Sequence, residues 1–500
     1  MGNGSSSVSR RWILAGLLAG TAQRSFAGGL SRSLVPPPRP DAGSGAGIAA
    51  AESLIAQAGL SGKIGFAVAD AQTGEILETH NPLLQLPPAS TAKTITTLYA
   101  LDTLGGDYRF HTRLLATGAL VNGRLEGDLI LAGGGDPTLD SDMLGALARQ
   151  LKETGLREVS GRFLYYDAAL PRLRMIDPGQ PVTAGYNPAI SGLNLNFNRV
   201  RFHWTRATDG WDVAMDARAR RYRPRVSVAR MRVVDRQVPV YTYAQEQGVD
   251  QWTVASGALG NEGSRWLPVR RPSVYAAEVF QTLARAHGID LPGAAVVRSL
   301  PDGATVLAER QSAPLSDILR AMLKYSTNLT AEAVGLAASA ARGAPSASLA
   351  GSAGAMGDWA SAALGVRRAR FVDHSGLGEA ARIAPADMVR ALVTAGPDGP
   401  LDGLLKQVPM RDAAGRPIRD GRVRVRAKTG TLNFASGLVG YVHAGDGRPL
   451  AFAIYAADLA RRAGLSPAEG ERPPGGRAWL GKARRLQMDL VDRWASLYSG

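Results

Sequence analysis

The chain has 500 residues, of which 45% are hydrophobic and eight are tryptophan, so the composition excludes a disordered protein and predicts two or three folded domains. It has no cysteine, which excludes disulfides, thiol nucleophiles and thiolate metal sites. Of the 58 basic residues behind the net charge of +15, only seven are lysine. Each lysine is therefore informative, because a desolvated lysine can lose its proton whereas an arginine cannot.

The N-terminus predicts an export signal over residues 1–27, followed by a Pro/Gly/Ser-rich linker over 28–46. Arg10-Arg11 precedes an apolar run, and Ser25-Phe26-Ala27 forms a small-x-small cleavage site. The apolar run is shorter than the 20 or so residues that a membrane-spanning helix needs. The stretch SRRWIL resembles a twin-arginine signal, so the export route stays open. We expect a periplasmic or otherwise exported protein with no transmembrane segment after signal cleavage.

The mature chain predicts an α+β domain that is interrupted by another region. Hydrophobic periodicity predicts helices and strands in both end segments, whereas residues 105–300 show short alternating strands, many turns and few long helical periods. We therefore expect the first part of the α+β domain at 47–104, an inserted β-rich region at 105–300 and the second part of the α+β domain at 301–500. The expected elements are a helix at 48–60, two strands within 64–80, a helix through 94–104, helices at 315–341 and 384–396, three strands within 422–458 and a final helix at 477–498.

The arginines cluster, with eleven of them between Arg199 and Arg236. In RYRPRVSVARMRVV they alternate with Val, Tyr and Met, a pattern that predicts strands with one solvated basic face. No nucleic-acid-binding module accompanies them, so we expect no nucleic-acid partner. If this face binds anything, an acidic polymer of the cell envelope is the better expectation for an exported protein.

The stretch PPASTAKTITTLYAL carries a candidate nucleophile and base. Pro87 and Pro88 can lead into a helix but cannot lie inside one, so Ser90 is expected near a helix N-terminus. The positive end of the helix dipole favours an alkoxide or oxyanion there. Lys93 lies one turn further on the same face. Burial and the dipole both favour its neutral amine, which can take the serine proton directly.

Two further motifs follow along the chain. Ser326-Thr327-Asn328 falls in the second helical region, and Ala427 to Thr431 (AKTGT) ends the strand before the final hairpin. Taken together, the three motifs resemble those of the serine DD-peptidases and penicillin-binding proteins.

The spacing of the motifs narrows the resemblance. Ser90 and Ser326 are 236 residues apart, far more than a compact β-lactamase has between the corresponding motifs, so the resemblance implies a large insertion between them. That arrangement resembles the type-4 penicillin-binding proteins, the D-alanyl-D-alanine carboxypeptidase/endopeptidase family. The stretches at 127–139, 186–198 and 373–378 are also similar to segments of this family. The last of them, DHSGLG, continues as EAARIAP where relatives usually have a more polar run, so His374 is given no catalytic role.

The resemblance implies a transpeptidase-type domain with an antiparallel sheet flanked by helices, and a role for each motif residue. Ser90 is the nucleophile, Lys93 its base and Ser326 a proton relay. The implied substrate-binding residues are Asn328, Lys428, Thr429 and Thr431. The backbone N–H groups of Ser90 and Thr431 form the implied oxyanion hole. The implied partners are muropeptide stems of peptidoglycan as substrate and β-lactams as covalent inhibitors, with no metal or cofactor.

Two other functions stay open, and several rival motifs fail. A serine β-lactamase or esterase on the same fold would differ in how fast its acyl-enzyme is hydrolysed, and a non-catalytic wall-binding protein would keep only the fold. GGGDPT lacks the Gly-Lys-Ser/Thr of a phosphate loop, the six histidines include no pair at helical metal spacing, and Gly-x-Ser-x-Gly is absent.

Overall fold

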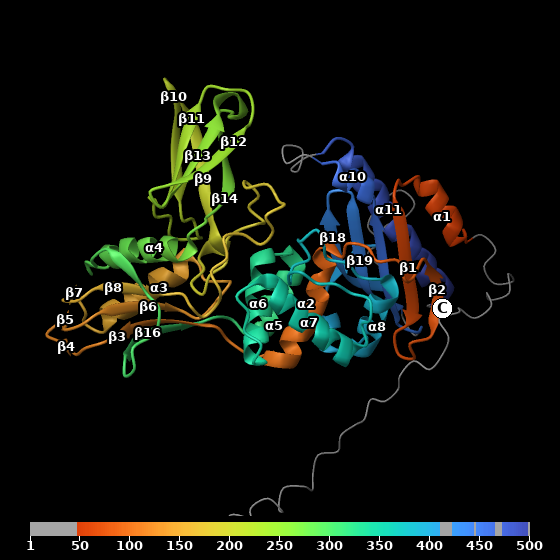
Figure 1. Ribbon diagram of the computed structural model, residues 1–500, viewed down its shortest axis with the longest axis horizontal. Coiled ribbons are helices and arrows are strands. Elements are labelled where there is room, and N and C mark those ends of the chain that lie inside the picture. The colour runs from red at the N-terminus through yellow and green to blue at the C-terminus, as the bar shows by residue number, and fades with distance from the viewer. Residues whose placement is uncertain (1–47, 411–422, 445–446, 466–472, 499–500) are drawn as a thin grey trace, which may run out of the picture. The chain divides into compact units, whose positions relative to one another are not determined.

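The computed structural model describes residues 48–410, 423–444, 447–465 and 473–498 (Figure 1). The expected export signal (1–27) and the expected linker (28–46) lie outside these residues. Among the helices that the structure describes, none is both long and apolar enough to cross a membrane.

A six-stranded sheet organises the two ends of the chain, and all its neighbouring strands are antiparallel (Figure 1). Two of its strands come from the N-terminal part, and the first of them pairs with the last strand of the C-terminal part, so the predicted interrupted α+β domain is confirmed. The strands in spatial order are β17 (Lys406–Val408), β18 (Val423–Leu432), β19 (Ala435–Ala444), β20 (Leu450–Ala457), β1 (Lys63–Asp70) and β2 (Ile76–His80).

Both faces of this sheet are covered by helices, as strand β20 shows. Its residues are buried throughout and alternate between two cores, with Phe452 and Ile454 facing one and Ala453 and Tyr455 facing the other. The first core is closed by α11 (Gly476–Tyr498) and α1 (Ala51–Ala58). The second is closed by α2 (Ala92–Leu104), α5 (Leu315–Tyr325), α6 (Asn328–Ala341), α7 (Leu349–Leu364), α8 (Pro385–Ala395) and α9 (Pro400–Leu404). A short helix, α10 (Leu459–Ala463), follows β20.

The inserted region contains a five-stranded mixed sheet with two helices in its core. Its strands in spatial order are β15 (Ala294–Val297), β8 (Phe163–Tyr166), β6 (Leu129–Gly133), β3 (His111–Ala116) and β16 (Thr305–Gln311), and its helices are α3 (Ser141–Glu153) and α4 (Pro272–Ala286). Because β16 pairs with β3, the expected boundary at residue 300 falls before the last strand, and we propose 105–311 for this region. The two helices were not predicted, although Leu144, Leu147 and Leu151 carry the helical repeat in α3.

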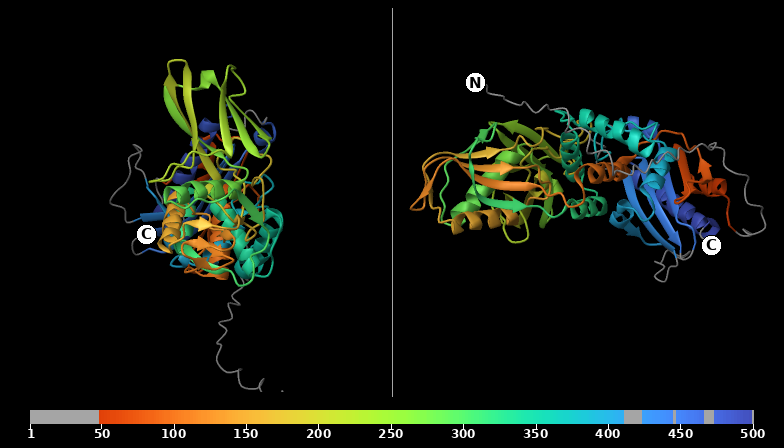
Figure 2. Two further views of the ribbon diagram at one scale, coloured as in Figure 1. Left: turned by 90° about the vertical axis from the view of Figure 1, so that its left-hand side faces the viewer. Right: turned by 90° about the horizontal axis from the view of Figure 1, so that it is seen from below.

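The remaining strands of the insert form three small sheets. Two of them make the lobe seen at the top of Figure 1 and in the left view of Figure 2. Their strands are β10 (Gly210–Asp216), β9 (Arg199–Ala207) and β14 (Glu262–Pro268), then β11 (Ala229–Val234), β13 (Val249–Ala255) and β12 (Tyr241–Glu246). The third sheet contains β4 (Leu120–Val121), β5 (Arg124–Leu125) and β7 (Glu158–Val159).

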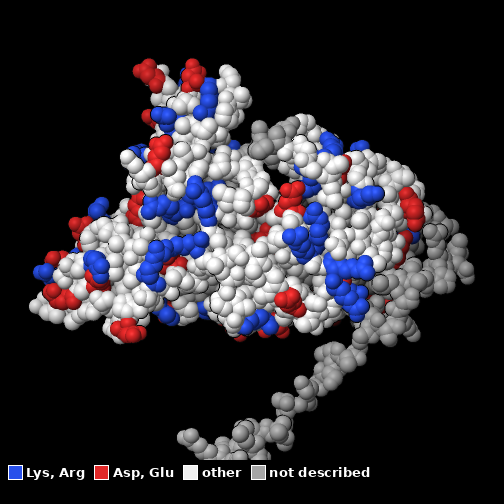
Figure 3. All heavy atoms as spheres, in the orientation of Figure 1, with Lys and Arg blue, Asp and Glu red and all other residues white. Residues whose placement is uncertain are grey.

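The arginine-rich segment is only partly strand. Strands β9, β10 and β11 lie within it, and Arg230 and Arg232 are exposed on alternate residues of β11, as a solvated basic face requires. Residues 221–228 are not a regular strand, because Pro224 cannot donate to a ladder. On the face drawn in Figure 3, Lys and Arg side chains are interspersed with Asp and Glu and form no continuous basic stripe.

Candidate active site

The candidate nucleophile lies on a tight turn that leads into a buried helix. Ser90 is the middle residue of a single 3₁₀ turn (Ala89–Thr91) that passes directly into α2, as the two prolines before it predicted. Ala89 has a φ of 47°, a left-handed conformation that is uncommon outside glycine. Thr91 fixes the turn, because its Oγ1 donates to the Pro88 carbonyl at 2.7 Å and lies 3.2 Å from Tyr455 Oη of the sheet.

Lys93 is fully buried beneath this turn, with 0% of its surface exposed. Its Nζ lies 3.0 Å from Ser90 Oγ and donates to Asn328 Oδ1 and to the Ser375 carbonyl, both at 2.8 Å. Burial lowers the pKa of Lys93 to about 8, opposed by the nearby Glu332 and Asp373 carboxylates. A neutral amine has two N–H groups and one lone pair. Since two of the three neighbours are carbonyl oxygens that only accept, the geometry suits a neutral amine whose lone pair faces the serine hydroxyl.

A buried carboxylate holds the main chain that contacts Lys93. Glu332 on α6 is fully buried, and its two oxygens accept from the N–H groups of His374 and Ser375, each at 2.9 Å. Burial is the main cause that raises the pKa of Glu332. Asp373 accepts from the N–H groups of Gly376 and Gly378 in the same segment. The two carboxylates thus fix the position of the Ser375 carbonyl against Lys93.

The second motif begins at a break between two helices. The continuous helical signal at 315–341 divides into α5 and α6, because Ser326 has a φ of 58° and ends α5 in the left-handed conformation. Asn328 is then the first residue of α6, and its Nδ2 donates to the Tyr186 carbonyl at 2.9 Å. That hydrogen bond directs Oδ1 of the same amide toward Lys93. The break therefore positions both polar side chains of the motif.

Lys428 on β18 connects the third motif to the second. It is 2% exposed, and its Nζ donates to Ser326 Oγ at 3.0 Å and to the Thr429 carbonyl at 2.7 Å. Burial, with the neighbouring charges of Lys93 and Lys406, lowers the pKa of Lys428 well below its usual range. An ammonium group has three donors, so one remains for an anion. Two residues further along β18, Gly430 lets the strand lie close to the turn that contains Ser90. A Cβ at position 430 would lie only 2.6 Å from the Pro88 carbonyl oxygen.

These residues surround one cavity of about 380 Å³. All the predicted site residues line it except the two buried lysines. Lys93 is hydrogen-bonded to Ser90 and Lys428 to Ser326, and both serines line the cavity. The lining residues are Ser90, Gln180, Tyr186, Ser326, Asn328, Gly376, Leu377, Thr429, Thr431, Leu432 and Asn433.

Several contributors were missed from the sequence. Gln180 and Tyr186 come from the inserted region. Tyr186 begins the stretch 186–198 that resembles a segment of the family, but neither residue was predicted to belong to the site. Glu332 stands four residues after Asn328, one helical turn away, but that spacing does not reveal its contacts with the main chain of residues 374–375. His374 is fully buried, its ring bonded to Ser352 and close to Met356, and burial lowers its pKa to about 3. His374 is not among the residues that line the cavity.

Comparison with known proteins finds relatives along nearly the whole described chain. A D-alanyl-D-alanine carboxypeptidase of Actinomadura sp. is 29% identical over 450 residues, which cover 81% of this chain and 79% of that protein. The D-alanyl-D-alanine carboxypeptidase DacB of Haemophilus influenzae is 26% identical over 286 residues, which cover 54% of this chain and 58% of that protein.

Solved structures share the fold. Penicillin-binding protein 4 from Haemophilus influenzae has a TM-score of 0.71 at 20% identity over 89% of this chain and 99% of that one. The same protein in complex with a β-lactam has a TM-score of 0.69 at 21% identity over 90% of this chain and 100% of that one. The fold is therefore the DD-peptidase-like α+β fold with an inserted β-rich region. Residues 48–468 match the model of the D-Ala-D-Ala carboxypeptidase 3 (S13) family, and the chain belongs to this family of peptidases.

Proposed function

We propose that the protein is a serine D-alanyl-D-alanine carboxypeptidase and endopeptidase that acts on peptidoglycan stem peptides through an acyl-enzyme on Ser90. One observation carries the proposal. The Ser90 hydroxyl and the buried Lys93 amine are 3.0 Å apart at the edge of a cavity that also contains Ser326 Oγ, which is bonded to the second buried lysine, Lys428.

In the proposed reaction, Ser90 Oγ attacks the carbonyl carbon of the penultimate D-alanine, and its proton passes to Lys93 Nζ. The backbone N–H groups of Ser90 and Thr431 stabilise the oxyanion, a type of contact worth roughly 3–4 kcal/mol per donor. The peptide C–N bond then breaks as Ser326 donates its hydroxyl proton to the leaving amine, and the proton that Lys93 took from Ser90 replaces the one that Ser326 gave. Water hydrolyses the ester on Ser90 and releases the shortened peptide.

Substrate orientation in this proposal depends on the third motif and on Asn328. The free N–H of Lys428, with the exposed hydroxyls of Thr429 and Thr431, binds the terminal carboxylate, whose charge raises the lowered pKa of Lys428 again. Asn328 hydrogen-bonds the peptide. A β-lactam carries a carboxylate and a strained amide in the same relation, so we expect penicillins to acylate Ser90. The β-lactam complex of a protein with the same fold supports this expectation.

The direct test is release of D-alanine from a muramyl pentapeptide, followed by chromatography. We expect the wild-type protein to release one D-alanine per stem and Ser90→Ala to release none while unfolding at the same temperature. Wild-type protein that binds the peptide without cleaving it would favour the non-catalytic wall-binding alternative. Cleavage that survives in Ser90→Ala would exclude this serine as the nucleophile.

The titration of Lys93 gives a pH dependence. The base must be neutral, so we expect the acylation rate to rise as pH increases through about 8. Because the Glu332 carboxylate raises the pKa of Lys93, Glu332→Gln should move this rise to lower pH. Asp358→Asn removes an exposed carboxylate from α7 and should leave the profile unchanged. Acylation rates measured with a fluorescent penicillin from pH 5 to pH 10 test this prediction. A pH–rate profile that is the same in Glu332→Gln as in wild type would contradict the effect of the Glu332 charge on Lys93.

We further propose that the protein is exported and acts in the periplasm or at the wall. The basic, apolar and small-residue pattern of residues 1–27 supports this, since peptidoglycan lies outside the cytoplasmic membrane. N-terminal sequencing of protein from the envelope should find a start near Gly28, and a retained Met1 would count against it.

A further inference from the structure

A second cavity, of about 350 Å³, lies within the inserted region, and no residue that lines the active-site cavity lines it. Its walls are the end of β8, the segment 167–174 that follows it, residues 190–191 and the first turn of α4. Four arginines and one carboxylate line it, namely Arg172, Arg174, Arg270, Arg271 and Asp167. The cavity is therefore strongly positive.

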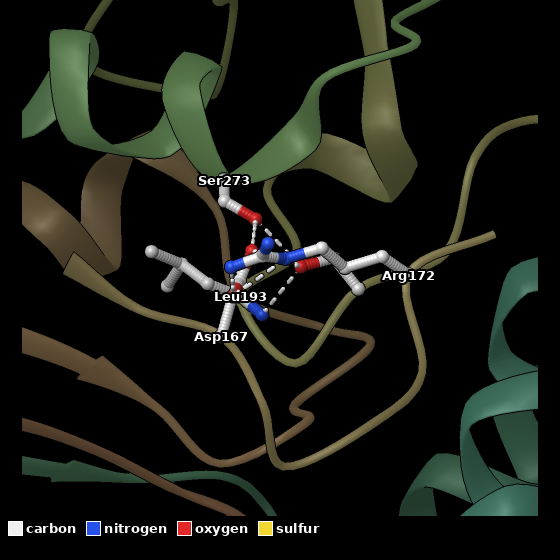
Figure 4. A network of polar contacts seen from close by, with 5 residues as sticks. Asp167, Arg172, Leu193 and Ser273 are labelled. Atoms are coloured by element: carbon white, nitrogen blue, oxygen red, sulfur yellow. Dashed lines mark hydrogen bonds and ion pairs between the residues drawn. The ribbon is translucent and has the colours of Figure 1, made fainter. Parts of the chain in front are cut away.

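The carboxylate in this cavity is already neutralised by a local network (Figure 4). Asp167 is buried and accepts from Arg172 Nε at 2.8 Å and from Ser273 Oγ at 2.5 Å. Ser273 Oγ lies 2.6 Å from Ser191 Oγ, which accepts from the Leu193 N–H at 3.1 Å. Asp167 and Arg172 thus form a closed ion pair that fixes the cavity wall, and the other three arginines keep their charge.

Those three arginines form no ion pair with a carboxylate among the described residues. Arg271 Nη1 donates to the Gly248 carbonyl, and Arg174 stacks over the Tyr243 ring at 5.9 Å. The other nearby carboxylate, Asp250, does not line the cavity. It accepts from the Arg270 main-chain N–H and from Tyr243 Oη. Asp250 carries a charge that interacts with Arg270 and Arg174 from outside the cavity, but among the described residues no carboxylate inside the cavity pairs with these three cations.

Arg270 is the unusual member of this set because it is only 5% exposed. Its two Nη atoms donate to the carbonyls of Arg174, Asn187 and Val182. Its Nε has no acceptor among the described residues, and burial lowers the pKa of its guanidinium. The Asp250 charge opposes this effect only in part, and the printed side-chain hydrogen bonds of Arg270 all go to neutral carbonyls. A buried charge in such a setting is costly, so an anion in the adjoining cavity would stabilise it.

The start of α4 adds a second source of positive potential. The helix has 15 residues and begins with Pro272, and its N-cap residue Arg271 makes no side-chain cap. The positive end of the helix dipole therefore faces the cavity wall formed by Pro272, Ser273 and Val274. The buried arginine and the helix end are independent features that attract the same kind of ligand.

We propose that this cavity binds an oxyanion group, a carboxylate or a phosphate, of an acidic cell-wall polymer. Guanidinium groups form bidentate hydrogen bonds with both carboxylates and phosphates. The cavity is large enough for the charged group and for the monomer unit of the polymer to which it is attached. The anion binding follows from the cavity alone, whereas the choice of a wall polymer rests on the proposed function. Bound in this way, the inserted region would hold the enzyme on its insoluble substrate.

The test compares two double variants that each remove two positive charges. Arg174→Gln with Arg271→Gln changes two exposed arginines of the cavity, and Arg230→Gln with Arg232→Gln changes two exposed arginines of β11 that do not line it. The probes are poly(glycerol phosphate) and poly(galacturonic acid), titrated calorimetrically at low and at physiological salt. Charge-assisted hydrogen bonds make each lost arginine worth about tenfold in affinity, so the cavity variant, which loses two, should bind about a hundredfold more weakly. The β11 variant should bind within about twofold of wild type.

The probe that loses affinity tells whether the natural group is phosphate or carboxylate. Equal binding by wild type and the cavity variant, a loss confined to the β11 variant, or no binding of either probe by wild type would each overturn the proposal. Acylation by a fluorescent penicillin should be the same in all three proteins. That reading separates a failure of the anion site from a failure of the proposed peptidase function.

Discussion

Lys93→Arg is expected to slow acylation of Ser90 by about 10²–10⁴-fold, the usual contribution of a positioned proton transfer. The substitution keeps a positive charge but removes the neutral state, because a guanidinium does not lose its proton in a protein. In the structure, two of the three groups around Lys93 Nζ are carbonyl oxygens, and the third is the Ser90 hydroxyl. An arginine there can donate to all three but cannot accept the serine proton.

The matched control is the same substitution at the other buried lysine. Lys428→Arg keeps what we propose for that position, a cation that donates to Ser326 and to the substrate carboxylate, so it should lose mainly affinity and fit. Rates with a fluorescent penicillin, on variants shown to be folded by thermal unfolding, should separate the two. Equal losses, or a milder effect at Lys93, would refute the division of roles between the lysines.

Gly376→Ala should disrupt the site without changing any group that takes part in the chemistry. Gly376 has a φ of 75°, and a Cβ there would overlap the carbonyl oxygen of Ala89, the residue before the nucleophile. Overpacking of this kind costs about 1–3 kcal/mol of stability. A displacement of about 1 Å at a reacting atom can cost about 10²-fold in rate. We therefore expect a lower unfolding temperature and an acylation rate reduced by about 10²-fold.

Gly354→Ala provides the control for that variant. Gly354 lies in α7, where a Cβ would meet no atom within 4 Å. Alanine in an exposed helix interior is favoured over glycine by about 0.5–1 kcal/mol, so this variant should be at least as stable as wild type and equally active. Comparable losses in both variants would show that the close contact with Ala89 does not support the nucleophile.

The end segments of the chain were largely predictable because their patterns are regular. Residues 477–498 and the three strands within 422–458 repeat with the helical and strand periods, and α11, β18, β19 and β20 lie there. The residues of the candidate site could be predicted from the three motifs for a similar reason. Each motif stands at the end of an element, where side chains from different elements can converge.

The contributors that were missed depend on long-range contacts. The left-handed φ of Ser326 could not be predicted, because this conformation is usually indicated by a glycine and the residue here is a serine. Only the structure shows that Ser326 separates α5 from α6. The main-chain carbonyl of Tyr186 accepts a hydrogen bond from Asn328, which lies 142 residues further along the chain. Every residue type has such a carbonyl, so the sequence does not mark this contact. Glu332 acts on Lys93 by its charge and by holding the main chain of residues 374–375, which contacts the lysine. Local sequence patterns do not encode such contacts.

The central claim is an acyl-enzyme on Ser90, and intact mass spectrometry after benzylpenicillin, followed over time, tests it most directly. We predict one persistent adduct per chain that maps to the peptide containing Ser90, with none on Ser90→Ala. An adduct that forms and is lost rapidly would indicate a β-lactamase on this fold. No adduct on the folded wild-type protein, or an adduct retained by Ser90→Ala, would contradict the account.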